Sequence, residues 1–262
     1  MHPALWISKT GLDAQQNDIA VISNNLANTS TVGYKKSRAV FEDLIYQNVR
    51  QPGAQSTADT ELPTGLMMGT GVKTVATAKS FTQGNVIVTD NALDLAIQGR
   101  GFFQILLPDG TTSYTRAGNF SLDETGQVVT PGNGYVLQPA ITIPIDAISV
   151  EVGADGTVTY MQQGNAAPVV AGNIQTADFI NPAGLEPIGE NLFVESGASG
   201  APVIGTPGLN GLGRFLSGAL ESSNVNVVEE LVGLIESQRA YEMNAKVISA
   251  VDQSLQFVTQ TL

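Results

Sequence analysis

The chain of 262 residues contains no cysteine and a single histidine, His2. Without cysteine it can form no disulfide, no thiolate metal site and no cysteine nucleophile. One histidine is too few for the usual zinc sites, and no Gly-x-Ser-x-Gly turn is present to expose a serine nucleophile. The sequence therefore argues against serine hydrolases and zinc enzymes, and we expect no metal and no cofactor.

Basic residues and long apolar runs are also scarce. The 12 lysines and arginines stand against 24 aspartates and glutamates, and this net charge of -12 repels phosphate backbones, so no nucleic-acid partner is expected. No apolar run is long enough to span a bilayer, which predicts no direct membrane insertion. The opening residues lack the basic start and apolar run of a secretory signal, so we expect no cleavable signal peptide.

Catalysis by paired carboxylates is the enzyme class that the composition leaves open. Two acidic side chains that converge in a β scaffold can hydrolyse glycosides, and the candidates here are Asp123, Glu124, Asp155 and Glu190. Most acidic side chains are simply solvated, however, so we predict that the chain is not an enzyme. A β-rich secreted protein that acts on carbohydrate or serves as an adhesin stays as the alternative of a different class.

Apolar residues recur every seven positions at both ends of the chain. At the amino end Ile22 lies on the same helix face as the repeat, and at the carboxyl end the repeat continues to residue 262. The two stripes are Leu5, Leu12, Ile19, Ile22, Leu26 and Val227, Leu234, Tyr241, Ile248, Leu255, Leu262. This spacing predicts two helices that pack at shallow angles, from Pro3 to Asn28 and from Val227 to Leu262, about 39 and 54 Å long.

The unequal helix lengths leave part of the longer stripe without an intramolecular partner. Neighbouring copies of the chain would then cover it, and we interpret both stripes as a polymerisation interface. The pattern alone is equally consistent with a helical hairpin that closes a monomeric domain. Asn226, with Glu229 three residues later, predicts the capped start of the second helix.

The segment between the helices reads as mainly antiparallel β, so the fold class is α+β, with the long terminal helices packed as a coiled-coil-like domain. Asp109-Gly110 and Asp155-Gly156 each predict a hairpin turn in which both central residues favour positive φ. Gly99-Arg100-Gly101 and Gly69-Thr70-Gly71 do not complete a phosphate-binding pattern, which favours tight backbone packing there. Residues 38–50 are expected to form a short helix, and residues 51–71 an extended segment that docks on another surface rather than a free linker.

Two phrases near the ends resemble the bacterial flagellar rod and hook axial protein family. The first is Asn24-Asn25-Leu26-Ala27-Asn28, followed by Gly33-Tyr34-Lys35; the second is Gln238-Arg239-Ala240-Tyr241-Glu242. The resemblance to the distal-rod members of the family extends over nearly the whole length, through LWISKTGLDAQQ, YQNVRQPGAQS, GRGFFQILLPDG and IGENLFVESGASGAP. A rod-specific segment is similar from Tyr46 to about Gly65 and includes Gln51, Pro52, Gly53, Leu62 and Pro63.

The resemblance implies a structural subunit of the distal rod, which polymerises with itself into a helical tube and transmits torque between motor and hook. It implies proximal rod proteins below, hook protein above, P-ring and L-ring proteins around the tube, and the flagellar type III export apparatus as further partners. The implied location is the basal-body rod as it crosses the periplasm. Hook protein or another rod subunit is the alternative within the family.

The same resemblance implies three regions in the chain. Residues 1–33 and 225–262 would form the terminal helical polymerisation domain. Residues 34–80 and 210–224 would connect it, with an extended rod-specific loop at about 46–65, to a β-rich domain of residues 81–209.

Overall fold

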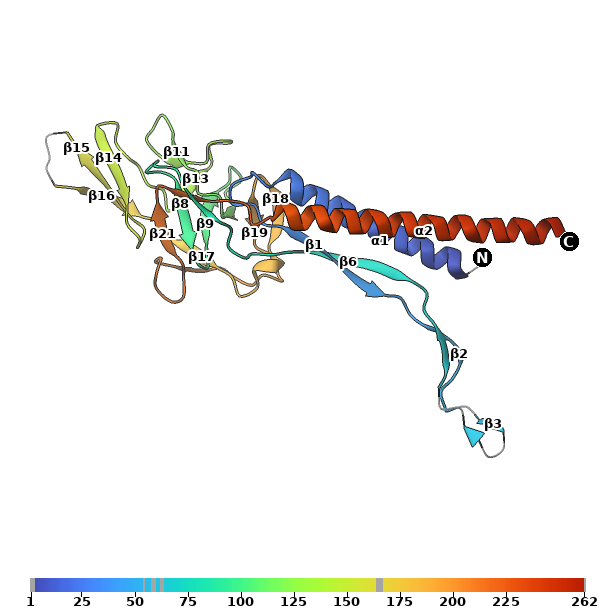
Figure 1. The fold of residues 1–262 in the computed structure, drawn as a ribbon. Helices are drawn as coiled ribbons and strands as arrows, with labels where there is room; N and C mark the ends of the chain where they lie inside the picture. The colour runs from blue at the N-terminus through green and yellow to red at the C-terminus, as the bar shows by residue number, and fades with distance from the viewer. Residues whose placement is uncertain (1–2, 54, 58–59, 62–63, 164–166, 262) are drawn as a thin grey trace. The chain divides into compact units, whose positions relative to one another are not determined.

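The computed structural model describes residues 3–53, 55–57, 60–61, 64–163 and 167–261. The chain divides into two compact units, each of which gathers segments from distant parts of the sequence. The first unit contains residues 1–27, 37–78 and 226–262, and the second contains residues 28–36 and 79–225. Long terminal helices and a central antiparallel β region confirm the α+β fold class (Figure 1).

The first unit is built around two long helices, α1 (Pro3–Ala27) and α2 (Val227–Thr261). Their bounds agree with the sequence prediction to within one residue at each end. Asn226 caps α2 as predicted, because its Oδ1 accepts a hydrogen bond from the backbone N–H of Val228 at 3.1 Å. The helices lie side by side and α2 extends past the start of α1 (Figure 1).

The strands of the first unit form two-stranded ribbons rather than the short helix that we expected over residues 38–50. That prediction was wrong because residues 37–43 and 47–50 find partner strands far along the chain, and this pairing overrides their local helix preference. The pairs are β1 (Ser37–Asp43) with β6 (Val72–Lys79, whose last residue belongs to the second unit), β2 (Gln47–Arg50) with β5 (Leu66–Met68), and β3 (Gln55–Thr57) with β4 (Thr60–Glu61).

The second unit holds one large antiparallel sheet and several small ones. Strands β11, β12, β13, β9, β10, β19 and β18 follow one another across the large sheet, β17 also pairs with β9, and β20 pairs with β17. Their bounds are β9 Phe102–Leu106, β10 Thr112–Thr115, β11 Ser121–Leu122, β12 Val128–Val129, β13 Val136–Gln138, β17 Thr176–Asp178, β18 Glu186–Gly189, β19 Leu192–Val194 and β20 Val203–Gly205.

Smaller sheets also belong to this unit. They pair β14 (Ala147–Val152) with β15 (Thr157–Gln162) and β16 (Val169–Asn173), β21 (Arg214–Ser217) with β8 (Leu95–Gln98), and β22 (Ala219–Glu221) with β7 (Val86–Val88). A 3-10 turn, η1, spans Pro182–Gly184. The main core cluster includes Leu95, Phe103, Ile105, Phe120, Leu137, Ile141, Val158, Ile174 and Phe215.

Both predicted hairpin turns are present, but their geometry differs from the prediction. In each turn only the glycine has positive φ, 84° at Gly110 and 88° at Gly156. Asp109 and Asp155 instead accept hydrogen bonds from Thr111 and Thr157, two residues further on. These bonds stabilise the charged carboxylate and lower the pKa of both aspartates, so the short polar side chain serves as a local hydrogen-bond acceptor rather than as a left-handed residue.

A buried ion cluster joins the two chain segments of the second unit, residues 28–36 and 79–225. Lys35 Nζ lies 2.6 Å from Glu221 Oε1, and Arg116 Nη1 lies 3.4 Å from Glu221 Oε2. Lys35 Nζ also donates to the carbonyl of Thr82 at 2.8 Å, and Arg116 Nη2 to that of Gly99 at 2.8 Å. Burial lowers the pKa of both cations, while attraction to Glu221 opposes this shift.

Because one carboxylate balances two buried cations, Glu221→Gln should destabilise the second unit by about 3–5 kcal/mol. The measurement is urea denaturation of the full chain followed by circular dichroism. Glu124→Gln, at an exposed turn position, is the matched control and should change the free energy of unfolding by less than about 0.5 kcal/mol. Equal stability of the two variants would show that the cluster does not hold this unit together.

Candidate functional site

The helix pair meets along a seam of small and polar side chains, which the sequence reasoning did not anticipate. Asn25 Nδ2 donates to Glu230 Oε2 at 3.0 Å, and Ser237 Oγ donates to Asp18 Oδ2 at 2.6 Å. Gly11 faces Asn244 closely enough that an added Cβ would lie 3.0 Å from its Nδ2. The helices are therefore antiparallel, and their contacts recur every seven residues on each of them.

The predicted apolar stripes lie mostly beside this seam rather than in it. Ile22 is buried and its Cδ1 lies 3.6 Å from where a Cβ on Gly233 would stand. The other stripe residues of α1, Leu5, Leu12, Ile19 and Leu26, are half-buried. On α2, Leu234 and Ile248 are half-buried and Val227, Tyr241 and Leu255 are exposed, while Leu262 lies outside the described residues.

A second apolar face of α2 points away from α1. Val232 and Ile235 each lie two residues from a seam position, which corresponds to about 200° around a helix. Their side chains are 50% and 48% exposed. Other exposed apolar side chains of the helix pair include Trp6, Ile7, Val228, Leu231, Met243, Val247 and Phe257. A single copy thus leaves apolar surface on more than one side of its helices.

The remaining face of α1 contacts the β1–β6 ribbon. Thr10 Oγ1 accepts a hydrogen bond from the N–H of Val72 at 3.4 Å, and Asn17 Nδ2 donates to Thr74 Oγ1 at 3.2 Å. Gly71 has φ of 122°, and a Cβ there would lie 2.1 Å from Thr10 Oγ1. This close approach agrees with the tight packing predicted for this glycine.

The described residues between 44 and 71 form a two-stranded arm with apolar side chains exposed along it. Ile45 is 88% exposed, and Tyr46, Val49, Leu66, Met67 and Met68 are also exposed. Of the rod-specific residues, Gln51, Pro52 and Gly53 are exposed, and Leu62 and Pro63 lie outside the described residues. Near its base the arm and the start of α1 line a groove of about 330 Å³, formed by Pro3, Trp6, Ile7, Gln47, Met68, Gly69 and Thr70.

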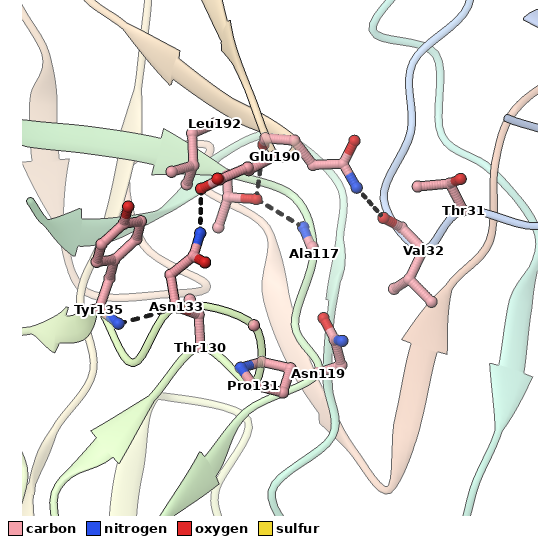
Figure 2. A pocket seen from close by; sticks show the side chains of 13 residues that line it. Thr31, Val32, Ala117, Asn119, Thr130, Pro131, Asn133, Tyr135, Glu190 and Leu192 are labelled. Atoms are coloured by element: carbon pink, nitrogen blue, oxygen red, sulfur yellow. Dashed lines mark hydrogen bonds between the residues drawn. The ribbon is translucent and has the colours of Figure 1, made fainter. Parts of the chain in front are cut away.

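A cavity of about 360 Å³ opens in the second unit, lined by residues from the stretches 31–32, 115–119, 130–135 and 190–192 (Figure 2). Asn133 donates to the Glu190 carboxylate across it, Asn191 Nδ2 donates to the Val32 carbonyl at 3.0 Å, and Thr115 Oγ1 donates to the Asn191 carbonyl at 2.9 Å. Each of these polar side chains thus has a hydrogen-bond partner within the protein. Glu190 is the only acid among the residues that line this cavity, whereas a glycosidase site requires two carboxyl groups.

Of the other candidate acids of a carboxylate pair, Asp123 and Asp155 bind within their own turns and Glu124 is exposed. Asp123 Oδ1 accepts from the N–H of Glu124, and Asp155 binds Thr157 as described above. Within the described ranges, no group of three or more metal-ligating side chains is gathered. Among the same residues no helix is long and apolar enough to cross a membrane. His2 lies outside the described residues.

Three family models match separate parts of the chain. Residues 6–35 match the model described as flagella basal body rod protein, residues 96–160 the flagellar hook protein FlgE/F/G D1 domain, and residues 216–261 the flagellar basal body rod FlgEFG protein C-terminal region. The match over residues 6–35 includes most of α1, and that over residues 216–261 includes all of α2.

Relatives named flagellar basal-body rod protein FlgG match almost the full length. One from Buchnera aphidicola subsp. Schizaphis graminum is 55% identical over 260 residues, covering 99% of this chain and 100% of the relative. One from Caulobacter vibrioides is 49% identical over 258 residues (98% of both), and one from Bacillus subtilis is 40% identical over 265 residues (98% of this chain and 97% of the relative). The chain belongs to the flagellar basal-body rod protein family. It is a structural component of the flagellar basal body.

The structure gives a physical role to several residues of the two rod-family motifs. Asn25 lies in the helix seam, Gly33 adopts φ of 69° and donates its N–H to the Glu221 carbonyl at 2.8 Å, and Tyr34 is buried next to Lys35. Asn24 and Ala27 are exposed and Asn28 is half-buried. In the second motif Gln238, Arg239 and Tyr241 are exposed and Ala240 is half-buried. The seven-residue spacing of small and polar residues at positions 11, 18, 25 and 230, 237, 244 was the signal in the sequence that would have located the seam.

The rod-family residue Gly33 should not tolerate a side chain, because a Cβ there would lie 2.5 Å from the backbone N of Ala117. Gly134 has the same φ of 69° but nothing within 4 Å of a Cβ, so it is a matched control for backbone strain alone. Gly134→Ala should cost about 1 kcal/mol, and Gly33→Ala about 2 kcal/mol more. Urea denaturation measures both, and similar losses would mean that the chain relieves the clash at no cost.

Proposed function

We propose that this rod-family chain polymerises through its paired terminal helices into the distal part of the rod, which turns as a drive shaft between motor and hook. The observation that carries the proposal is the apolar face of α2, which α1 leaves in contact with water. Val228, Val232 and Ile235 follow one another at helical spacing on that face. Monomeric soluble proteins rarely leave extended apolar patches of this kind uncovered.

The predicted stripe residues belong to the same proposal. They flank the polar seam, so a second helix pair that packs beside the first would meet Leu5, Leu12, Ile19 and Leu26 on one helix and Leu234, Tyr241 and Ile248 on the other. Burial of this apolar surface in an assembly stabilises it by roughly 25 cal/mol per Å². The division into a terminal helical polymerisation domain, a connecting segment and a β-rich domain is proposed on the same grounds.

The same proposal extends to the neighbouring proteins of the rod and to its location in the cell envelope. We infer that the tube adjoins proximal rod proteins below and hook protein above, that the P-ring and L-ring proteins surround it in the periplasm, and that the type III apparatus exports the subunit. The role is structural and not catalytic. The satisfied polar side chains of the cavity beside Glu190, with its single acid, support this against a carbohydrate-active enzyme.

The arm of residues 44–71 is proposed to stiffen the tube by contact with neighbouring subunits. A two-stranded ribbon has little stability in water, and this one exposes apolar side chains on both strands, at Val49 and Met67 for example. The curvature of rods assembled from a chain without residues 46–65 tests the role, and unchanged curvature would count against it.

A charge on the outer face of α2 should block assembly and leave the monomer folded. Val232→Asp and Ile235→Asp replace half-exposed side chains, so the free energy of unfolding should change by less than about 1 kcal/mol. In a rod, each variant would bury an unpaired carboxylate at a cost of several kcal/mol. Motility in soft agar and electron microscopy of isolated basal bodies, in a strain that lacks the native gene, measure assembly.

The matched control is Gln253→Asp, which adds the same charge at an exposed polar position of α2. Export of each variant is checked by immunoblotting of secreted protein, so that a defect in export is not mistaken for a defect in assembly. Normal rods from both face variants would refute packing through this surface.

A further inference from the structure

The apolar stripes of the helix pair cannot by themselves define how α1 and α2 align. Leu5, Leu12, Ile19 and Leu26 repeat every seven residues, as do Leu234, Tyr241, Ile248 and Leu255. A slip of one helix by seven residues therefore places apolar side chains where apolar side chains stood before. In such repeats a buried polar residue is what distinguishes one alignment from the next.

Asn25 is the polar residue at the seam that is fixed from outside the helix pair. It is 2% exposed, its Oδ1 accepts from the N–H of Ser37 at 2.9 Å, and its Nδ2 donates to the Ser37 carbonyl at 2.8 Å. Ser37 begins β1, which belongs to the same unit. The side chain is thus held in one orientation by the strand, and its Nδ2 also donates to the Glu230 carboxylate at 3.0 Å.

We propose that the contact between Asn25 and Glu230 sets the register of the helix pair, with Asn25 as a positioning residue that selects one of several alignments equally compatible with the apolar stripes. A slip of α2 by seven residues in one direction would place Glu230 opposite Asp18, so that two carboxylates would face each other in the seam. A slip in the other direction would carry Glu230 past Ala27, where α1 ends, and would leave Asn25 facing Ser237.

The register also fixes how far α2 extends beyond α1. Continuing the seven-residue steps from Gly11 and Asn244 places Ala4 beside Val251, so the last turns of α2 reach past the start of α1 (Figure 1). Every copy then presents the same outer surface. The register itself is a property of one chain, and only its consequence for a regular tube rests on the proposed function.

The absence of cysteine allows the register to be read by paired cysteine substitutions in the full chain. Ile22→Cys with Gly233→Cys reports the observed alignment, because these positions face each other. Ile22→Cys with Ala240→Cys reports a slip of seven residues, which moves the partner by about 10 Å. A short bis-maleimide reagent is applied to monomeric protein, and the internally cross-linked monomer is quantified by mass spectrometry.

In the otherwise unchanged chain the 22/233 pair should cross-link and the 22/240 pair should not. Replacing the contact by Asn25→Leu with Glu230→Leu, which leaves no unpaired buried charge, should lower the ratio of the 22/233 product to the 22/240 product at least about tenfold. The exposed pair Gln16→Leu with Glu236→Leu is the control and should leave the ratio unchanged. Glu230→Gln, whose amide oxygen still accepts from Asn25, should also keep the original ratio.

An unchanged ratio in the leucine pair, or equal cross-linking of both reporters before any substitution, would overturn the proposal. If the leucine pair does not fold by circular dichroism, Asn25→Ala provides the same readout with a smaller change and the same expected loss of register. Because the measurement uses monomers, failure of rod assembly does not affect it.

Discussion

The α1–α2 seam is narrow and consists of small and polar side chains. Most of the apolar side chains of the two helices therefore lie outside it. Because Gly11, Asp18 and Asn25 occupy the contact, most of the large apolar side chains of α1 stand beside it. On α2 the same geometry turns Val232 and Ile235 to the opposite side. Hydrogen bonds and close packing therefore hold α1 against α2, while the apolar side chains outside the seam are available for contacts with other copies.

The second unit is held together differently, by an apolar core and a buried ion cluster of Lys35, Arg116 and Glu221. Lys35 lies near the end of the first chain segment of this unit, residues 28–36, and Glu221 lies near the end of the second, residues 79–225. The cluster therefore joins the two segments from which the unit is built.

Much of this architecture could be predicted from the sequence, for identifiable reasons. The seven-residue repeats, Pro3 and the Asn226 cap define both helices almost to the residue, and the Asp-Gly pairs locate two hairpins. The helix prediction for residues 38–50 was wrong because local propensity does not report strand pairing with distant residues. The prediction of positive φ at both central turn residues was wrong because Asp109 instead accepts a hydrogen bond through its side chain.

The seam was missed because apolar periodicity was taken to mark the contact itself. An apolar stripe indicates that a helix face becomes buried, but it does not identify the partner that buries it. Here the other helix of the same chain contacts the small and polar positions next to the stripe. The family was recognisable from the terminal motifs, yet the roles of Asn25 and Gly33 required coordinates, since each contacts residues far from its own motif along the chain.

The most direct test of this account is a helical reconstruction of the isolated rod by electron cryomicroscopy. We expect each subunit to retain the contact between Asn25 and Glu230, and the side chains of Val232 and Ile235 to be buried against neighbouring copies. A rod in which these side chains remain exposed to solvent, or in which the helices of one chain no longer pair with each other, would contradict the account.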